Sequence, residues 1–422
     1  MNNTTYSEQT LNAIESGDIE EANRLFSWAL RKDDDETIYN LAGELFAIGY
    51  DTKALRIYQK LMKKYPADSE FKIDSAEILI DQGKNDEAIE LLDSVDPDSE
   101  NYLQALLVAA DLYQTEELFE VSESKLLEAY SIAPDEPAIV FALAELYNNM
   151  QDYEQATKYY LDLIQRGIPK FAQTNLVERL ANSYAAAGKF ETAIAYFDQI
   201  HEKDLTPNIL FQTGLTYLQL KENERAREAF ERVIEMDATF ASVYPYLVQT
   251  YAEDEDWKNA LKAAQEGLGV DSYNIDLYLQ AATMAEHLQQ VDEVEEFLRK
   301  GYQTDPENVE ILIRLTDFLN RQDNYQNTLK ILENVEFTDP QLEWNYAIAS
   351  WHQDDIHQAS ESFEAVGDAL DDNAVFLKDY FTFLIEQGEV EKAVSKLRKY
   401  VLLEPEDIEM QDQLMQYEEQ GY

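Results

Sequence analysis

The hydrophobic pattern of this chain repeats. A small residue, usually followed four positions later by a large apolar one, returns about every 34 residues along nearly the whole sequence. The steps between successive small residues range from 31 to 37, and most are 34. A fixed period of this kind predicts one array of stacked repeats rather than separate globular domains. The small positions are Ala22, Ala54, Ala88, Ser122, Ala156, Ala193, Ala226, Ala260, Val294, Thr328, Ala359 and Ala393.

Each period predicts two helices joined by a tight turn. In one unit, apolar residues recur at helical spacing over 137–147, the polar segment 148–152 breaks the pattern, and a second amphipathic stretch follows over 153–164. No segment alternates apolar and polar residues as a half-buried strand would. Five residues before the small position, where positive φ would reverse the chain tightly, stand Gly49, Gly83, Gly188 and Gly388.

These residues resemble the tetratricopeptide repeat (TPR), a helix–turn–helix unit of about 34 residues. With the small residue counted as repeat position 20, position 8 is also mostly small, positions 11 and 24 are mostly large, and position 32 is often proline. Small residues let paired helices approach, large ones fill the remaining space, and proline ends the second helix. The position-11 tyrosines are Tyr113, Tyr147, Tyr184, Tyr217 and Tyr251, and the prolines are Pro66, Pro134, Pro306, Pro340 and Pro405.

The resemblance covers roughly residues 7–405 and implies the fold. We expect an all-α, right-handed TPR superhelix (an α-α solenoid) of about twelve repeats, with a polar cap helix over 407–420. Residues 1–422 would form one solenoid. An insertion at 167–170 and a shortened region at 337–343 either separate sub-blocks 1–166, 170–337 and 341–422 or are tolerated loop variation. Less regular packing is expected where the pattern departs, at Phe381, Val294, Thr328 and Ala264 with Gly267.

Composition restricts the function classes. The chain has 422 residues, with 33 Lys and Arg against 85 Asp and Glu, for a formal net charge of −52. This charge repels phosphates, so we expect no nucleic-acid partner and no docking on anionic lipid. The absence of cysteine excludes disulfides, thiolate metal sites and a cysteine nucleophile. With neither a signal-peptide pattern nor a membrane-spanning apolar stretch, a cytoplasmic protein without membrane insertion is expected. An alternative explanation for the acidic composition is the acidic surface of a halophile's protein.

Enzyme signatures are missing from the sequence. The glycine–lysine pairs at 83–84 and 188–189 lack the Ser or Thr that completes a phosphate-binding loop, and 267–269 lacks the third glycine of a dinucleotide fingerprint. Two of the four histidines are five residues apart, so one helix would point them in different directions and they would not share a zinc ion. We therefore expect no catalytic residue, no cofactor and no metal. The histidines are His201, His287, His352 and His357.

If the first helices of the repeats line a concave face, as in the TPR family, positions 2, 5, 9, 12 and 13 face it. In units two to twelve thirteen of these positions are acidic, and the two basic ones are Arg321 and Lys378. The lysines with which some TPR proteins hold an acidic C-terminus are absent. The alternative for an apolar residue is contact with the next repeat, and for an acid a solvated surface. The candidate groove residues are Tyr39, Phe46, Ile73, Glu77, Asp81, Leu107, Asp111, Phe141, Glu145, Phe211, Leu218, Trp344 and Trp351.

An acidic groove with aromatic residues predicts a protein-binding function. We expect a non-enzymatic cytoplasmic scaffold or adaptor that binds a basic or amphipathic segment of a partner protein. The chain is similar to bacterial multi-TPR proteins that have no fused effector domain, which implies a role in regulation or assembly. Two alternatives stay open: a small-peptide receptor or signalling regulator, and a self-assembling structural protein.

Overall fold

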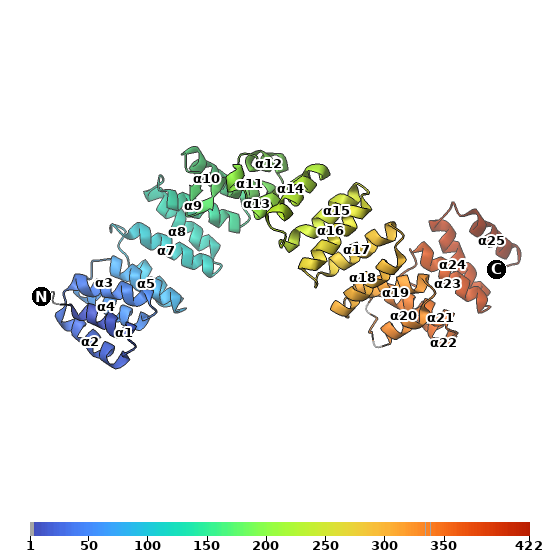
Figure 1. Cartoon of the computed structure of the whole chain (residues 1–422), viewed down its shortest axis with the longest axis horizontal. Helices are drawn as coiled ribbons and strands as arrows, with labels where there is room; N and C mark the ends of the chain where they lie inside the picture. The colour runs from blue at the N-terminus through green and yellow to red at the C-terminus, as the bar shows by residue number, and fades with distance from the viewer. Residues whose placement is uncertain (1–3, 334, 338) are drawn as a thin grey trace. The chain divides into compact units, whose positions relative to one another are not determined.

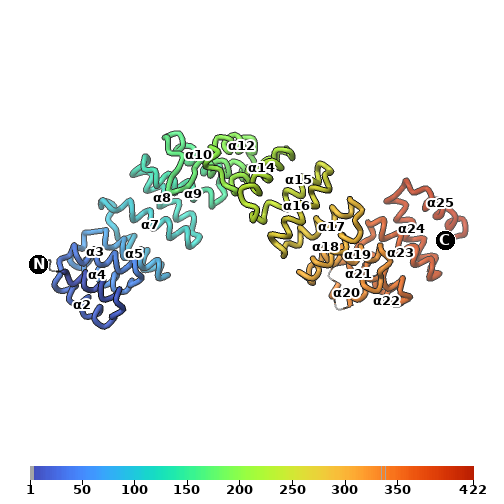
Figure 2. Tube along the Cα trace, viewed as in Figure 1, coloured from blue at the N-terminus to red at the C-terminus, as the bar shows by residue number. Residues whose placement is uncertain are grey.

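The computed structural model describes residues 4–333, 335–337 and 339–422. Within these residues the chain forms 25 α-helices, α1 to α25, and it divides into two compact units, Met1–Leu205 and Thr206–Tyr422. Within each unit, consecutive helices form antiparallel pairs that follow one another along the chain (Figures 1 and 2). The all-α TPR solenoid predicted from the repeat pattern is therefore confirmed. The sub-blocks predicted from the repeat spacing stay a prediction.

The described residues of the first unit form six helix pairs, a short hairpin and one 3-10 turn. Its elements are α1 (Tyr6–Glu15), α2 (Ile19–Lys32), α3 (Asp35–Ala47), α4 (Asp51–Lys64), α5 (Glu70–Asp81), α6 (Asn85–Asp93), α7 (Tyr102–Thr115), α8 (Phe119–Ile132), α9 (Pro137–Asn149), α10 (Tyr153–Gln165), β1 (Lys170–Phe171), β2 (Thr174–Asn175), α11 (Leu176–Ala186), α12 (Phe190–Phe197) and η1 (Glu202–Asp204).

In the second unit, the residues that the structure describes form six further pairs, one 3-10 turn and a terminal helix. Its elements are α13 (Pro207–Gln219), α14 (Asn223–Met236), η2 (Ala241–Val243), α15 (Tyr244–Glu253), α16 (Trp257–Val270), α17 (Ile275–His287), α18 (Val291–Thr304), α19 (Val309–Arg321), α20 (Tyr325–Leu332), α21 (Pro340–His352), α22 (Ile356–Val366), α23 (Ala374–Glu386), α24 (Val390–Leu403) and α25 (Ile408–Glu419). The last is the predicted cap helix.

Every pair is joined by a turn in which one residue has positive φ, five positions before the small residue. The four glycines named from the sequence occupy it, together with Gly17. In the other units a non-glycine residue adopts φ between 55° and 61°, a conformation that costs an L-residue roughly 1–2 kcal/mol. Geometry thus fixes this position even where the sequence carries no glycine. Those residues are Glu117, Gln151, Lys221, Glu255, Gln289, Asp323 and Asp354.

The core of each repeat forms where the small residues allow two helices to touch. Ala54, Ala88 and Ala156 are fully buried, and the large residue four positions after each of them is also buried. A polar small residue is accommodated by a hydrogen bond. The Ser122 hydroxyl donates to the carbonyl of Ala110 at 2.9 Å, and the equivalent Thr328 hydroxyl donates to the carbonyl of Thr316 at 3.5 Å.

The insertion between α10 and α11 forms a β-hairpin, which corrects the expectation that the chain contains no strand. β1 and β2 pair antiparallel, Lys170 with Asn175 and Phe171 with Thr174. The two turn residues, Ala172 and Gln173, both have positive φ, as a tight two-residue hairpin requires. Strands of two residues are too short to show the alternation by which strands are recognised in a sequence.

Two departures from the repeat pattern are explained by their neighbours. Phe381, at a position that is small elsewhere, is buried and packs edge-on against Tyr417 of α25, with ring centroids 6.3 Å apart. The cap helix therefore covers the ring of Phe381. Gly267 stands where other repeats have a larger residue, because the side chains of Tyr244 and Leu277 occupy the space that a side chain at position 267 would need. A Cβ at this position would lie 2.6 Å from the nearest atom of Tyr244 and 2.8 Å from that of Leu277.

Candidate functional site

A surface hollow in the first unit gathers several of the predicted groove residues. It encloses about 460 Å³ and lies on three successive first helices, α3, α5 and α7. Five of the candidates line it, so the structure brings together side chains that are up to 65 positions apart in the sequence. We call it the α3–α5–α7 hollow. It is lined by Phe46, Glu77, Ile80, Asp81, Leu107, Val108 and Asp111.

The repeat register explains why these side chains meet. Phe46 and Ile80 occupy the same repeat position on α3 and α5, and Glu77 and Asp111 occupy the same position on α5 and α7. Because stacked repeats present equivalent positions on one face, the apolar residues form one row and the carboxylates another. The hollow is thus a product of the repeat and not of a single unusual segment.

The hollow combines an apolar floor with uncompensated negative charge. Phe46, Ile80 and Leu107 are half-buried, whereas Asp81 and Asp111 are exposed. Burial, reinforced by the negative charge of Asp81, raises the pKa of Glu77 above its ordinary value. Among the described lining residues none is basic. The arrangement suits a positively charged group attached to an apolar stem, since the cation would relieve the repulsion among the carboxylates.

Tyr39 lies beside the hollow in a cluster of aromatic rings rather than in its lining. Its ring packs edge-on against Tyr58 and Phe71, and its hydroxyl donates to the Glu70 carboxylate at 3.0 Å. The same cluster holds Asp74 of α5, whose pKa burial raises to about 6 from an ordinary value of 3.8, with Glu70 and Glu77 adding to the shift. When a carboxyl group whose pKa is raised in the folded state ionises, the free energy of unfolding decreases.

We therefore expect Asp74→Asn to stabilise the protein near neutral pH. Between pH 3.8 and about 6 the folded state binds more protons at Asp74 than the unfolded chain does, so ionisation lowers the free energy of unfolding as the pH rises through this window. The amide removes that loss. Urea unfolding should show a gain at pH 7.5 that shrinks as the pH falls toward 5. The exposed carboxylate Asp111, changed to Asn, is the control; an equal gain from both variants would refute the assignment.

The remaining candidates lie outside the hollow, and three of them are in the core. Ile73 is fully buried, and Phe211 and Trp344 are 9% and 8% exposed, so they contact neighbouring helices instead of an exposed groove. The reason is their place at repeat position 5, which faces the next repeat in these units. Leu218 on α13 is half-buried. Trp351 is also half-buried, and its indole N–H donates to the Glu386 carboxylate at 2.9 Å.

Phe141 and Glu145 are engaged by parts of their own unit. The ring of Phe171, on the hairpin, lies 5.2 Å from the ring of Phe141. The Glu145 carboxylate accepts a hydrogen bond from the hydroxyl of Tyr160 and pairs with Arg179 at 3.5 Å. The hairpin and these polar contacts therefore occupy the surface that the sequence offered for binding.

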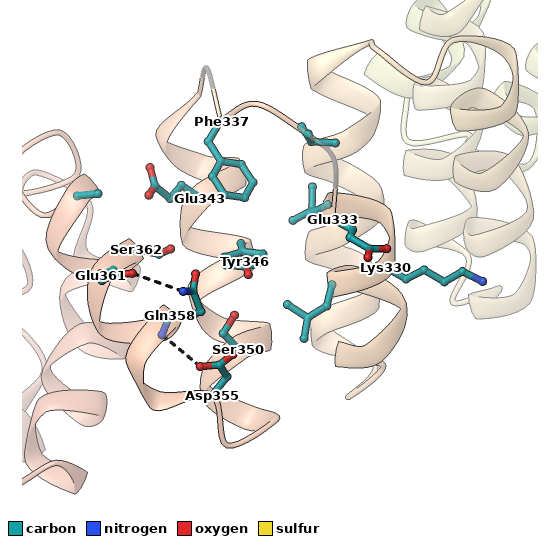
Figure 3. Close-up of a pocket in the computed structure, with 14 residues that line it drawn as sticks. Lys330, Glu333, Phe337, Glu343, Tyr346, Ser350, Asp355, Gln358, Glu361 and Ser362 are labelled. Atoms are coloured by element: carbon teal, nitrogen blue, oxygen red, sulfur yellow. Dashed lines mark hydrogen bonds between the residues drawn. The ribbon is translucent and has the colours of Figure 1, made fainter.

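A larger hollow of about 640 Å³ lies between α20, α21 and α22 in the second unit (Figure 3). It forms where α20 ends after eight residues, while its counterparts α18 and α24 each have fourteen. Phe337 packs against Tyr346 at one side, with ring centroids 5.2 Å apart. At the other side, the side-chain amide of Gln358 donates to the Glu361 carboxylate and its backbone N–H donates to the Asp355 carboxylate. Four of its charged residues, Lys330, Glu333, Asp355 and Glu361, are exposed, whereas Glu343 is half-buried. The lining contains none of the groove candidates.

Two of the four histidines stack on aromatic rings. His287 stacks on Trp257 with ring centroids 3.9 Å apart, and His352 stacks on Tyr325 at 4.4 Å. In the part of the chain that the structure describes, no group of three or more His, Asp or Glu side chains has a metal-binding arrangement. No described helix has both the length and the hydrophobicity needed to cross a membrane.

Comparison with known proteins decides the family. The TPR repeat-containing protein YpiA of Bacillus subtilis (strain 168) is 30% identical over 419 residues, which is 99% of both chains. This chain belongs to the YpiA-like TPR family. Models for the YpiA-like tetratricopeptide repeats match residues 114–168 and, for the C-terminal repeats, 340–407. General tetratricopeptide repeat models match residues 52–110, which include most of the hollow, and 178–239.

Solved TPR assemblies align with this YpiA-like chain at lower similarity. A chain of the APC/C hetero-tetramer Cut9-Hcn1 is 14% identical, with 97% of this chain and 95% of that chain covered and a TM-score of 0.38. A chain of Naa15/Naa10 bound to HypK-THB is 17% identical, with 91% and 65% covered and a TM-score of 0.43.

Two lining residues of the YpiA-like hollow, Ile80 and Val108, were not among the candidates. Ile80 shares the repeat position of Phe46, so the register alone carries the signal that finds it. Val108 stands at repeat position 6, outside the positions expected to face the groove. It is half-buried and reaches the lining from α7, a contact that only the packed structure reveals.

Proposed function

We propose that this YpiA-like protein is a non-enzymatic cytoplasmic scaffold that holds a basic or amphipathic segment of a partner protein in the α3–α5–α7 hollow. TPR repeats generally mediate protein–protein interaction, which supports the class of function. The observation that carries the proposal is the combination of Glu77, Asp81 and Asp111 around an apolar floor, contributed by successive repeats.

The chemistry of the hollow selects the partner segment. Lysine or arginine side chains would extend apolar stems along Phe46, Ile80 and Leu107 and place their charges among the carboxylates. An amphipathic helix with cations at a spacing of three or four residues presents such side chains on one face. At low salt, the net charge of −52 would speed the encounter of a basic segment with the hollow.

The test reverses charge at the two exposed carboxylates. Asp81→Lys with Asp111→Lys should lower the amount of basic partner captured from the native lysate at low salt by about tenfold or more, since like charges at an interface cost several kcal/mol. Both side chains are exposed, so the fold should persist. Glu90→Lys with Glu154→Lys, on exposed positions of α6 and α10, makes the same change in net charge and should leave capture unchanged.

Three other results would reject this placement. Equal losses for both double variants would mean that net charge, and not the hollow, recruits the partner. Undiminished capture by Asp81→Lys with Asp111→Lys would place the interface elsewhere. If the wild-type protein captures no partner but gains mass with concentration in sedimentation, self-assembly becomes the better account.

A further inference from the structure

The outer helix α4 carries positive charge on a strongly negative protein. It contains five cations and a single carboxylate, Asp51. Lys53, Arg56, Lys60 and Lys63 follow one another at steps of three or four residues, so they lie along one face of the helix. With Leu30 of α2, the last three of these cations border a further hollow, of about 580 Å³, which we call the α2–α4 groove. It is lined by Leu30, Arg56, Gln59, Lys60, Lys63 and Lys64.

The cations of α4 are largely free of carboxylate partners. Among the described residues, Lys64 of this group forms an ion pair, with Asp35. Lys60 instead donates to the backbone carbonyl of Leu30 at 2.6 Å, and the Arg56 guanidinium lies 5.9 Å from the centre of the Phe26 ring. The charges of Arg56 and Lys63, both exposed and without an ion pair among the described residues, therefore remain available at the groove.

In the other lysine-rich outer helix, α24, most of the cations form ion pairs with carboxylates, in contrast to those of α4. There Lys392 pairs with Glu364 and Glu389, Lys396 and Lys399 pair with Asp371, and Arg398 pairs with Glu418. Favourable interaction with the helix dipole accounts for cations in the last turn of α4, namely Lys63 and Lys64. It does not account for Lys53 and Arg56, which lie in the first half of the helix.

We propose that the α2–α4 groove is a second interaction surface, which binds a short acidic segment of a partner protein. The segment presents Asp or Glu side chains about one helical turn apart, matched to the stripe from Lys53 to Lys63, which is roughly 15 Å long at 1.5 Å per residue. At physiological salt, charges are screened beyond about 8 Å, so the groove acts locally despite the negative charge of the whole protein.

The dimensions favour a protein segment over other polyanions. Duplex nucleic acid carries one charge per roughly 1.7 Å and would extend past the stripe onto acidic surface, where it is repelled. An anionic membrane is a still broader surface and meets the same repulsion. A short acidic peptide ends within the groove and also places apolar side chains against Leu30.

The experiment measures binding of a fluorescein-labelled 12-residue peptide, about 18 Å long as a helix, to the full chain by fluorescence anisotropy at 0.15 M salt. The peptide has a stripe of glutamates at steps of three and four residues among alanine and leucine. We expect Arg56→Glu with Lys63→Glu to weaken binding about tenfold or more. Both side chains are exposed, and Lys60 keeps its hydrogen bond. The control, Lys158→Glu with Lys258→Glu, changes two exposed lysines elsewhere and should bind like wild type.

Several results would overturn the proposal. Equal weakening in both double variants would show that only net charge matters, and no binding of the peptide to the wild-type chain at millimolar concentration would leave the groove without this ligand class. An 18-nucleotide single-stranded DNA or phosphatidylglycerol vesicles that bind the groove more tightly than the peptide would assign it to a different partner. Asp81→Lys with Asp111→Lys should retain peptide binding, which separates this surface from the α3–α5–α7 hollow.

Discussion

Replacing Phe363 by alanine is expected to lower the free energy of unfolding by about 3–5 kcal/mol. Phe363 is fully buried at the centre of an aromatic cluster in the second unit, with its ring 5.0 Å from Tyr380, 4.9 Å from Phe383 and 6.1 Å from Phe376. These partners all come from α23, the first helix of the next pair, so the substitution removes packing between successive pairs.

The loss of stability in Phe363→Ala should be confined to the neighbouring repeats, because stacked repeats are stabilised mainly by their nearest neighbours. Trp351, whose ring is 6.4 Å from Phe363, and Trp344, whose ring is 5.6 Å from Phe376, report on this region. In a protein whose other two tryptophans, Trp28 and Trp257, are changed to phenylalanine, their fluorescence in a urea titration should change at a lower urea concentration when Phe363 is replaced. The control is Val375→Ala on α23, a side chain that is 64% exposed. Its effect should stay within about 0.5 kcal/mol. Similar midpoints for Phe363→Ala and wild type would contradict the packing described.

Gly267→Ala is expected to destabilise the protein by about 1–3 kcal/mol, although alanine favours a helix more than glycine does. The new methyl group would lie 2.6 Å from the Cβ atom of Tyr244 and 2.8 Å from a terminal carbon of Leu277. These atoms belong to α15 and α17, which pack on either side of α16. The helices would have to move apart, and contacts on both sides would weaken.

Gly269, two residues further along α16, provides a control of opposite sign. No heavy atom lies within 4 Å of the place where its Cβ would stand, and the residue is exposed. Gly269→Ala should therefore stabilise the protein, by up to about 1 kcal/mol. Thermal unfolding of both variants measures the difference. A stabilising Gly267→Ala would show that the helices around α16 have room that the structure does not show.

The repeat pattern was sufficient to predict the fold because the residues that define it make the contacts between helices. Ala54, Ala88 and Ala156 stand where helices cross, and the turn position five residues earlier has positive φ whether it is Gly83 or Gln151. Such features depend on sequence neighbours and recur in every unit. They can therefore be recognised without knowledge of the tertiary structure.

The candidate site could be predicted only in part, because exposure depends on how far each repeat is covered by its neighbours. Phe46 and Leu107 are partly accessible to solvent, whereas Trp344 is in the core. Phe141 packs against Phe171 of the inserted hairpin. Nothing in a repeat register indicates what an insertion will cover. The sequence also does not show which cations lack an ion pair, since the lysines and arginines of α4 and those of α24 follow similar patterns along their helices.

The most direct test of the proposed partner site is photo-crosslinking from the α3–α5–α7 hollow in the native cell. A benzoylphenylalanine residue would replace Leu107, which lines the hollow, and in a separate protein Glu90, which is exposed on the outer helix α6. We expect a discrete crosslinked partner from position 107, lost when Asp81→Lys and Asp111→Lys are added, and no such product from position 90. The same products from both positions, or a product from 107 that survives the two lysines, would contradict the account.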